Sequence, residues 1–174
     1  IMISDLDEIP NPEVIKKFNP QMRYAAFKQK NFNYKLNLLG SKNPDWIGTR
    51  ICLNKYLNSP QWLRELKFKK RPVWRIDKWR LNNIIENGGW HFCNLKGPEE
   101  LLYKYQNLCE TDDPINFKEK IDKKYLNLSE IDNRIKKGLD IIGRDDFFTR
   151  VEVDETYPKY LLNNINNYFK WIDS

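Results

Sequence analysis

Residues 1–10 read Ile-Met-Ile-Ser-Asp-Leu-Asp-Glu-Ile-Pro, an apolar run followed by three carboxylates. Such a run, bounded by a turn signal, is typical of a buried strand, and Pro10 cannot donate to a further ladder bond. Asp5 and Asp7 are two residues apart, so in an extended backbone their side chains point to one side, about 7 Å apart. Two carboxylates at the end of a strand suit Mg²⁺ or Mn²⁺, with substrate phosphates completing the coordination. A solvated acidic turn fits the same pattern, because carboxylates are mostly surface residues.

The composition indicates one globular domain. The chain has 174 residues, of which 40% are hydrophobic and 14% aromatic, enough to bury a core. No apolar run approaches the roughly 20 residues of a transmembrane helix, so we expect no membrane-spanning segment in this chain. Cys52, Cys93 and Cys109 show no Cys-x-x-Cys spacing, which argues against a zinc site or a disulfide scaffold and slightly favours a reducing compartment.

The charge balance is moderately basic, with 30 Lys and Arg against 24 Asp and Glu and a net charge of +6. A surplus of this sign attracts phosphates, on nucleic acid or on a nucleotide sugar. The basic residues gather between Arg64 and Arg80, interleaved with aromatic residues that could stack on bases. No nucleic-acid motif accompanies them and acidic residues dilute them, so we expect no nucleic-acid partner. A solvated loop or a phosphate-facing flap is the favoured interpretation.

The pattern along the chain predicts an α/β fold. Asn11-Pro12 is typical of a helix start, and period-two alternation over 32–38 predicts a half-buried strand. Further strands are expected at 46–53 and 88–95, and helices at 60–66, 97–108, 116–125, 129–137 and 157–171. The first residues already form a strand with the acidic cluster, whereas a parallel α/β sheet needs strands and crossover helices before its functional strand. We therefore expect the C-terminal part of a longer domain, with its N-terminal portion missing.

Two phosphate chemistries use an apolar strand followed by Asp-x-Asp. In a phosphatase of the haloacid-dehalogenase type the first Asp is a nucleophile and Thr normally follows four positions later, where this chain has Ile9. In a nucleotide-sugar glycosyltransferase the Asp pair holds a metal that bridges the diphosphate and neutralises the charge that develops on it. The residue at position 9 disfavours the first.

His91 is the only histidine, and its setting is Gly88-Gly89-Trp90-His91. A lone histidine is more often structural than a ligand. The two glycines would permit a close approach of backbone to a ligand, and Trp90 offers a flat face for a sugar ring. Imidazole also suits Mn²⁺ beside carboxylates, which makes His91 a candidate ligand.

A glycosyl transfer by single displacement needs a carboxylate that takes the proton from the attacking hydroxyl. Glu110, Asp112 and Asp45 are all chemically able to do this. Each of them also fits an ordinary surface acid.

An ordered series of segments resembles glycosyltransferase family 17, the family of β-1,4-mannosyl-glycoprotein 4-β-N-acetylglucosaminyltransferases. The likeness runs from residue 1 to about residue 168. It is carried by Asp5-Leu-Asp-Glu-Ile-Pro10, Trp46-Ile-Gly-Thr-Arg50, Gly88-Gly-Trp-His-Phe92, Lys104 with Glu110, Gly138-Leu-Asp-Ile-Ile-Gly-Arg144 and Tyr157-Pro-Lys-Tyr-Leu-Leu-Asn163. Asp-x-Asp alone is common to many transferases, whereas Asp-x-Asp-Glu-Ile-Pro followed by Gly-Gly-Trp-His is much more specific.

The resemblance implies a GT-A-type fold, a UDP-N-acetylglucosamine donor, a glycan acceptor of mannosyl type, Mn²⁺ or Mg²⁺, and inversion at the anomeric carbon. Asp5 and Asp7 match the motif for the metal and diphosphate, and Trp90 and His91 match Gly-Trp-His. Glu110 matches the acid of a His-x-Glu pattern whose histidine this chain lacks; it is the expected catalytic base. The family's nucleotide-binding strands precede Asp-x-Asp, so residues 1–174 are expected to be a single but incomplete glycosyltransferase domain.

Two alternatives to a transferase stay open, a non-catalytic carbohydrate-binding remnant and a metal-dependent phosphatase. Asn and Lys are abundant, which suggests an AT-rich genome, microbial or viral. In that case we expect a cytoplasmic protein, and a Golgi enzyme only if an N-terminal anchor precedes this chain.

Overall fold

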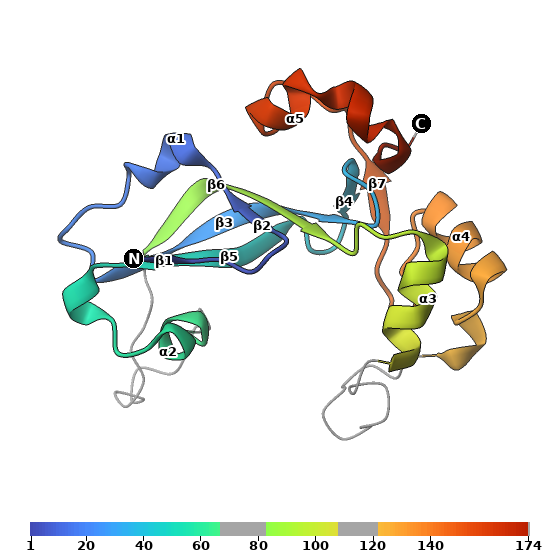
Figure 1. Ribbon diagram of the computed structural model, residues 1–174, viewed down its shortest axis with the longest axis horizontal. Coiled ribbons are helices and arrows are strands. Elements are labelled where there is room, and N and C mark those ends of the chain that lie inside the picture. The colour runs from blue at the N-terminus through green and yellow to red at the C-terminus, as the bar shows by residue number, and fades with distance from the viewer. Residues whose placement is uncertain (67–82, 108–121, 174) are drawn as a thin grey trace. The chain divides into compact units, whose positions relative to one another are not determined.

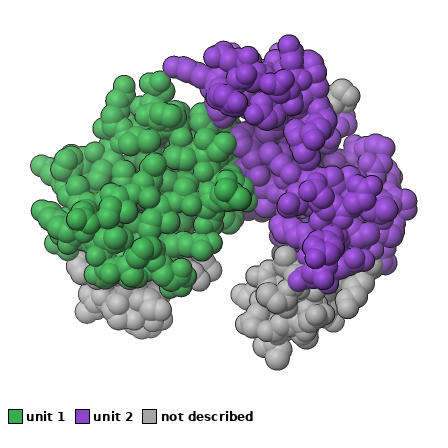
Figure 2. Space-filling view, in the orientation of Figure 1, with its two compact units in different colours: residues 1–31, 45–91 green, residues 32–44, 92–174 purple. Residues whose placement is uncertain are grey.

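The computed structural model describes residues 1–66, 83–107 and 122–173, which form a mixed α/β fold (Figure 1). The described chain divides into two compact units, each made of two separate stretches. Unit 1 contains residues 1–31 and 45–91, and unit 2 contains residues 32–44 and 92–174 (Figure 2). The α/β class predicted from the sequence is confirmed at this level. The basic stretch after residue 66 and most of the helix predicted at 116–125 lie outside the described residues.

The strands of unit 1 pair mainly in antiparallel fashion. β1 (Met2–Ile3) pairs with β5 (Asp45–Cys52), β5 pairs with β3 (Tyr24–Asn33), and β2 (Glu8–Pro10) pairs with β6 (Ile84–Cys93). The expectation of a parallel sheet around the acidic strand is therefore wrong, because both β1 and β2 run against their neighbours. The sheet is nevertheless mixed, since β6 also pairs with β3.

The direction of that last pairing follows from its hydrogen bonds. The Ala26 N–H donates to the Asn83 carbonyl in unit 1, and the Tyr34 N–H donates to the Cys93 carbonyl in unit 2, each at 3.0 Å. The partners advance together along both strands, as they do in a parallel pair.

Alternating residues of β3 explain why unit 1 has a helix on each side of its sheet. Ala25 and Phe27 belong to one buried cluster, and Tyr24 and Ala26 belong to another. A strand that is buried on both faces needs cover on both faces. Helix α1 (Pro12–Ile15) adds Val14 to the first cluster and α2 (Pro60–Arg64) adds Leu63 to the second (Figure 1).

Local signals account for both helix starts in unit 1. The Asn11 side chain accepts the Glu13 N–H at 3.0 Å and Pro12 occupies the first turn, as predicted. The helix ends at Ile15 after a single turn. Ser59 caps α2 in the same way, accepting the Trp62 N–H at 3.0 Å before Pro60.

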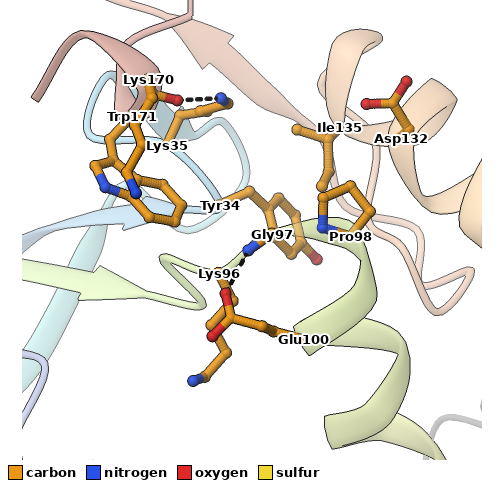
Figure 3. Close-up of a pocket in the computed structure, with 10 residues that line it drawn as sticks. All are labelled: Tyr34, Lys35, Lys96, Gly97, Pro98, Glu100, Asp132, Ile135, Lys170 and Trp171. Carbon is orange, nitrogen blue, oxygen red and sulfur yellow. Dashed lines mark hydrogen bonds between the residues drawn. The ribbon is translucent and has the colours of Figure 1, made fainter.

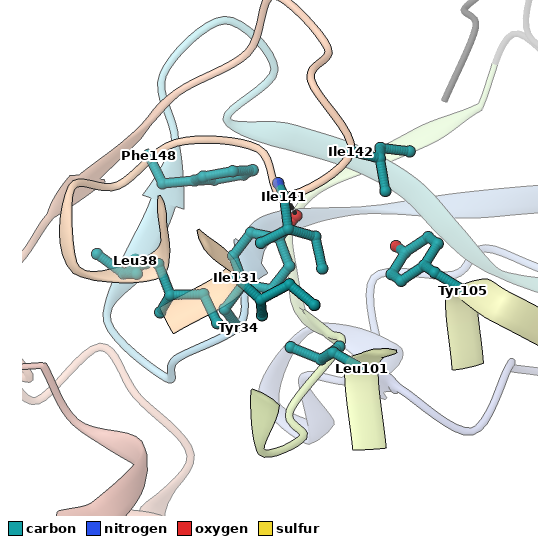
Figure 4. Close-up of a cluster of buried hydrophobic side chains, with 9 residues drawn as sticks. Tyr34, Leu38, Leu101, Tyr105, Ile131, Ile141, Ile142 and Phe148 are labelled. Atoms are coloured by element: carbon teal, nitrogen blue, oxygen red, sulfur yellow. Dashed lines mark hydrogen bonds between the residues drawn. The ribbon is translucent and has the colours of Figure 1, made fainter. Parts of the chain in front are cut away.

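Unit 2 is built around one larger apolar core. It contains β4 (Leu38–Gly40), β7 (Phe148–Arg150), α3 (Pro98–Asn107), α4 (Leu128–Lys136) and α5 (Lys159–Asn163), with the short 3₁₀ helices Lys123–Tyr125 and Ile165–Trp171. β4 pairs antiparallel with β7, a strand too short to show a period in the sequence. Figure 4 shows the buried cluster, whose members are Tyr34, Leu38, Leu101, Tyr105, Ile131, Ile135, Ile141, Ile142 and Phe148.

Three predicted boundaries in unit 2 differ from the structure. The strand expected to continue to Leu38 breaks at Tyr34, whose φ of 64° lies in the left-handed region. Asn127, not Ser129, caps α4 by accepting the Glu130 N–H at 2.9 Å. The last expected helix is two short pieces. Gly138 ends the α4 region with φ 64°, as predicted.

None of the helices among the described residues combines the length and the apolar character needed to cross a bilayer.

Candidate functional site

The two sequence segments that carry the family resemblance most specifically are partners in one β-ladder of unit 1. In the antiparallel pairing of β2 with β6, Glu8 lies opposite His91, Ile9 opposite Trp90 and Pro10 opposite Gly89. Segments about 80 positions apart in the sequence are thereby brought side by side. The turn that carries Asp5 and Asp7 leads directly into this ladder.

The two glycines of the second segment are required by strand packing. Gly89 has φ 130°, and a Cβ there would lie 2.1 Å from the Ile9 carbonyl oxygen. A Cβ on Gly88 would lie 2.6 Å from the Cβ of Phe27. From the sequence we expected these glycines to let the backbone approach a ligand. In the structure they instead let β6 approach its neighbouring strands closely.

Glu8 is buried and anchors the acidic turn. Its carboxylate accepts the Trp46 indole N–H at 2.8 Å, the Asp5 backbone N–H at 3.1 Å and the Thr49 hydroxyl at 3.4 Å. Gly48 leaves room for it, since a Cβ there would lie 2.8 Å from the Glu8 carboxyl carbon. A buried carboxylate with three donors is stabilised in place, so it fixes where Asp5 and Asp7 project. No pattern in the sequence indicates this role, because it depends on Trp46 and Thr49, which are distant from Glu8 in the chain.

Asp7 and His91 lie close together, as the sequence interpretation required. Asp7 Oδ2 is 3.4 Å from His91 Nε2. The Asp7 side chain is 40% exposed whereas His91 is only 7% exposed, so the pair opens to solvent on the carboxylate side. Two other residues hold the His91 ring in place. Asn31 Oδ1 lies 2.9 Å from Nδ1, and the Trp46 ring stacks on the imidazole at 4.6 Å between centroids with 14° between planes.

The contact with Asn31 fixes the chemistry of the other ring nitrogen. An amide oxygen can only accept, so Nδ1 carries a proton and donates it. Burial lowers the pKa of His91 from its ordinary value, and the nearby carboxylates of Asp7 and Glu8 oppose that shift. When the ring is protonated, Nε2 faces Asp7 as the cationic partner of an ion pair. When the ring is neutral with its proton on Nδ1, the Nε2 lone pair faces the carboxylate, and a metal ion between the two atoms stabilises that arrangement.

The spacing of these two atoms fits a small divalent ion. Ligands about 2.1 Å from an octahedrally coordinated metal lie about 3 Å apart when adjacent. The Asp7–His91 distance of 3.4 Å is close to this value, and one carboxylate with one imidazole suits Mn²⁺. Two protein ligands leave further positions for water or substrate oxygens.

Asp5, which the sequence pairs with Asp7, has a different partner. Its Oδ1 accepts from the Arg64 guanidinium at 3.0 Å, and both side chains are partly exposed. Of the two aspartates, Asp7 is the one that faces His91, and Asp5 would have to leave Arg64 to act as a metal ligand. Arg64, from the start of the basic stretch, was not singled out from the sequence.

The remaining predicted residues are placed less favourably for binding. Trp90 is 6% exposed, so its ring offers no open face to a sugar. The exposed indole beside the histidine is Trp46, 41% exposed, which the sequence interpretation quoted only as part of a motif. Glu110 lies outside the described residues, and so does Asp112; the role of catalytic base stays a prediction.

One buried polar atom of the neighbourhood has no partner within the described parts of the chain. Gln29 donates through Nε2 to Thr49 Oγ1 at 3.2 Å, and Thr49 in turn donates to Glu8, but the Gln29 Oε1 atom accepts nothing. A buried acceptor left in this way costs free energy.

Comparisons of the chain with protein-family models, with curated proteins and with solved structures found no match. The geometry therefore carries the functional argument together with the sequence motifs.

Proposed function

We propose that this protein is a metal-dependent, inverting glycosyltransferase of the GT-A type, similar to glycosyltransferase family 17. In this proposal it transfers N-acetylglucosamine from UDP-N-acetylglucosamine to a hydroxyl of a mannosyl-type glycan, with Mn²⁺ or Mg²⁺ as the cofactor. The residues assigned to the cofactor and donor site are Asp5, Asp7 and His91.

One observation carries the proposal: the Asp-x-Asp turn and the Gly-Gly-Trp-His segment meet in the β2–β6 ladder, with Asp7 and His91 3.4 Å apart. If the two motifs were chance matches, nothing would require them to be adjacent. Their adjacency supports a shared role for the carboxylate and the imidazole.

The surrounding residues prepare these two ligands. Asn31 holds the ring in the tautomer that leaves Nε2 free, and Trp46 limits its rotation. Glu8 fixes the turn that projects Asp7. When bound, the metal would supply Lewis acidity that neutralises charge on the departing diphosphate.

The acceptor side of the reaction is assigned to Glu110. In this role its carboxylate would take the proton of the attacking hydroxyl, which contributes roughly 10²–10⁴-fold to the rate. We expect Glu110→Gln to lower turnover by that factor while donor binding is nearly unchanged. Wild-type turnover in this variant would place the base elsewhere.

The metal site is tested first, because its assay does not depend on knowing the acceptor. Mn²⁺ binding to the purified chain is measured by electron paramagnetic resonance. Asp7→Asn and His91→Phe should each weaken binding at least tenfold, because each removes one of two protein ligands. His91→Phe keeps a flat ring against Trp46. Asp145→Asn is the matched control, since Asp145 is an exposed acid of unit 2.

Turnover is tested in the purified protein by UDP release from UDP-N-acetylglucosamine with a panel of glycan acceptors. We expect activity that EDTA removes and Mn²⁺ restores, and that Asp7→Asn loses. Mn²⁺ binding without UDP release on any acceptor would favour the carbohydrate-binding alternative. Equal Mn²⁺ affinity in Asp7→Asn, His91→Phe and the control would refute the metal site itself.

A further inference from the structure

Unit 2 contains a cavity of about 280 Å³ that none of the residues of the candidate metal site lines. Pockets for small molecules begin at about 300 Å³, so its size suits a ligand as small as one sugar ring. Figure 3 shows Trp171 on one side of the cavity, Pro98 and Ile135 on another, and Tyr34 between them. The cavity therefore has a flat aromatic wall and an apolar wall.

The lysines at this cavity differ from its acids in their partners. Three lysines line it, Lys35, Lys96 and Lys170, and none of them forms an ion pair with an acid among the residues that the structure describes. Lys35 Nζ donates to the Lys170 carbonyl oxygen at 2.7 Å, and Lys170 Nζ lies 4.9 Å from the centre of the Trp171 ring. Within the described residues, no carboxylate forms an ion pair with these three ammonium groups.

The two acids of the cavity are already used by other partners. Glu100 accepts the Gly97 N–H at 3.0 Å, and Asp132 pairs with Lys136 at 2.5 Å. In each contact only one of the two carboxylate oxygens is involved, so the other can still accept a hydrogen bond. The cavity thus combines positive charge with acceptors suited to hydroxyl groups.

The aromatic wall is held in place by the backbone. The Leu36 N–H donates to the Trp171 carbonyl at 2.7 Å, and Asn37 exchanges two 2.8 Å hydrogen bonds with the Asp173 backbone. Tyr34, immediately before this segment, adopts φ 64°, which costs free energy in a non-glycine residue. The bend at Tyr34 and these hydrogen bonds place Lys35 and Trp171 at the cavity.

We propose that this cavity binds an acidic saccharide, meaning a sugar ring that carries a carboxylate, phosphate or sulfate group. The lysines would meet the anionic group, the free carboxylate oxygens would accept the hydroxyl protons, and the apolar face of the ring would stack on Trp171. A nucleotide would use the lysines and the tryptophan but offers fewer hydroxyl donors to Glu100 and Asp132. This proposal does not depend on the transferase activity proposed above.

Binding is tested on the purified chain by isothermal titration with glucuronic acid and glucose phosphate. Glucose, inorganic phosphate and uridine monophosphate are the comparison ligands. We expect at least one acidic sugar to bind tighter than all three. Lys96→Gln and Lys170→Gln should each weaken that binding up to about fivefold, the effect of one exposed ion pair. Trp171→Ala should weaken it on the order of tenfold.

Lys137→Gln is the matched control, because Lys137 is an exposed lysine of the same unit, does not line the cavity and carries the same charge. If Lys137→Gln and Lys96→Gln lowered the affinity for the acidic sugar equally, the lysines would act only through long-range electrostatic attraction, and the proposal would be overturned. So would inorganic phosphate or uridine monophosphate that binds as tightly as the acidic sugars, or the absence of binding by both acidic sugars. Because the lysine variants alter only side chains at the cavity rim, a folding defect in Trp171→Ala would leave the test intact.

Discussion

The two units each bury a carboxylate, and they surround it differently. In unit 1, Asp7 immediately precedes the buried Glu8, and its carboxylate faces both His91 Nε2 and solvent. In unit 2, Asp140 is 3% exposed and is followed by Ile141 and Ile142 of the apolar core. Asp140 accepts the Tyr34 hydroxyl at 3.2 Å and the Ile142 N–H at 3.0 Å.

The difference separates structural from functional acids. Glu8 and Asp140 are both satisfied by several donors, which is what stability requires of a buried carboxylate. Asp7 and His91 instead face each other at 3.4 Å with Asp7 partly exposed, an arrangement that a proton or a metal ion between the two atoms stabilises. A search for buried carboxylates alone would have selected Glu8 and Asp140 as functional residues. The several hydrogen bonds that each of them accepts indicate a structural role instead.

The largest effect is expected from Gly89→Ala, which disrupts the ladder that unites the two motifs. Its added Cβ would meet the Ile9 carbonyl at 2.1 Å in a backbone conformation that side chains rarely adopt. We expect a loss of about 4 kcal/mol in the free energy of unfolding, measured by chemical denaturation. Gly97→Ala is the control, since the atoms nearest to a Cβ there are 3.7 and 3.8 Å away. Equal stability of the two variants would contradict this packing.

Asp140→Ala tests whether the buried carboxylate of unit 2 is purely structural. The Tyr34 hydroxyl and the backbone N–H groups of Ile142 and Arg144 lose their acceptor. We expect a loss of about 3 kcal/mol in the free energy of unfolding with unchanged Mn²⁺ affinity. Reduced Mn²⁺ affinity at temperatures where the variant is folded would show that Asp140 also contributes to metal binding.

Glu8→Ala, unlike Asp140→Ala, should lower Mn²⁺ affinity as well as stability. It removes the acceptor of the Trp46 indole and of the Asp5 N–H, so we expect about 2 kcal/mol less stability. Because the turn that carries Asp7 is loosened as well, Mn²⁺ affinity should fall with it. Calorimetry of both variants, with and without Mn²⁺, measures their stability and their Mn²⁺ affinity. Retention of wild-type affinity in Glu8→Ala would mean that the turn does not need its anchor.

Asn31→Ala tests whether the orientation of the imidazole matters. Without the acceptor at Nδ1, the ring can rotate and the Nε2 proton becomes competitive. Loss of such an outer partner lowers metal affinity about tenfold, which electron paramagnetic resonance of Mn²⁺ can measure. Asn166→Ala, at an exposed position of unit 2, serves as the reference. An unchanged affinity would assign Asn31 to structure only.

The smallest effect is expected from Arg64→Gln. It releases Asp5 from its exposed ion pair, so Asp5 becomes free to join Asp7 on a metal. We expect Mn²⁺ affinity to rise about threefold, within the range that an exposed ion pair is worth. Arg23→Gln controls for the lost charge. Weaker Mn²⁺ binding in Arg64→Gln would exclude Asp5 from the coordination.

Sequence reasoning succeeded where the determinants are local. Asn11 and Pro12 begin a helix because capping and a fixed φ act within one turn, and Gly138 ends one for a comparable reason. The proximity of Asp7 and His91 was expected from the ligands that Mn²⁺ prefers, since no local pattern spans the distance between them.

What the sequence left unseen depends on contacts between distant strands. The anchoring of Glu8 by Trp46 requires β2 and β5 to be neighbours, and no period in either strand encodes that. The break at Tyr34 is hidden because its phenol satisfies the alternating pattern of 32–38 while its backbone leaves the strand. The reason for Gly88 and Gly89 was equally hidden, because a glycine that admits a ligand and one that admits a neighbouring strand look alike in sequence.

The pairing of Glu8 with His91 limits how the gene for this protein can change. Side chains alternate between faces along a strand, so a shift of one residue in this ladder would turn the histidine to the opposite face of the sheet. Deletions or insertions inside 8–10 or 89–91 should therefore abolish metal binding outright. The connection between these two short stretches is constrained as well, because it carries Asn31 and Trp46, which hold the imidazole in place.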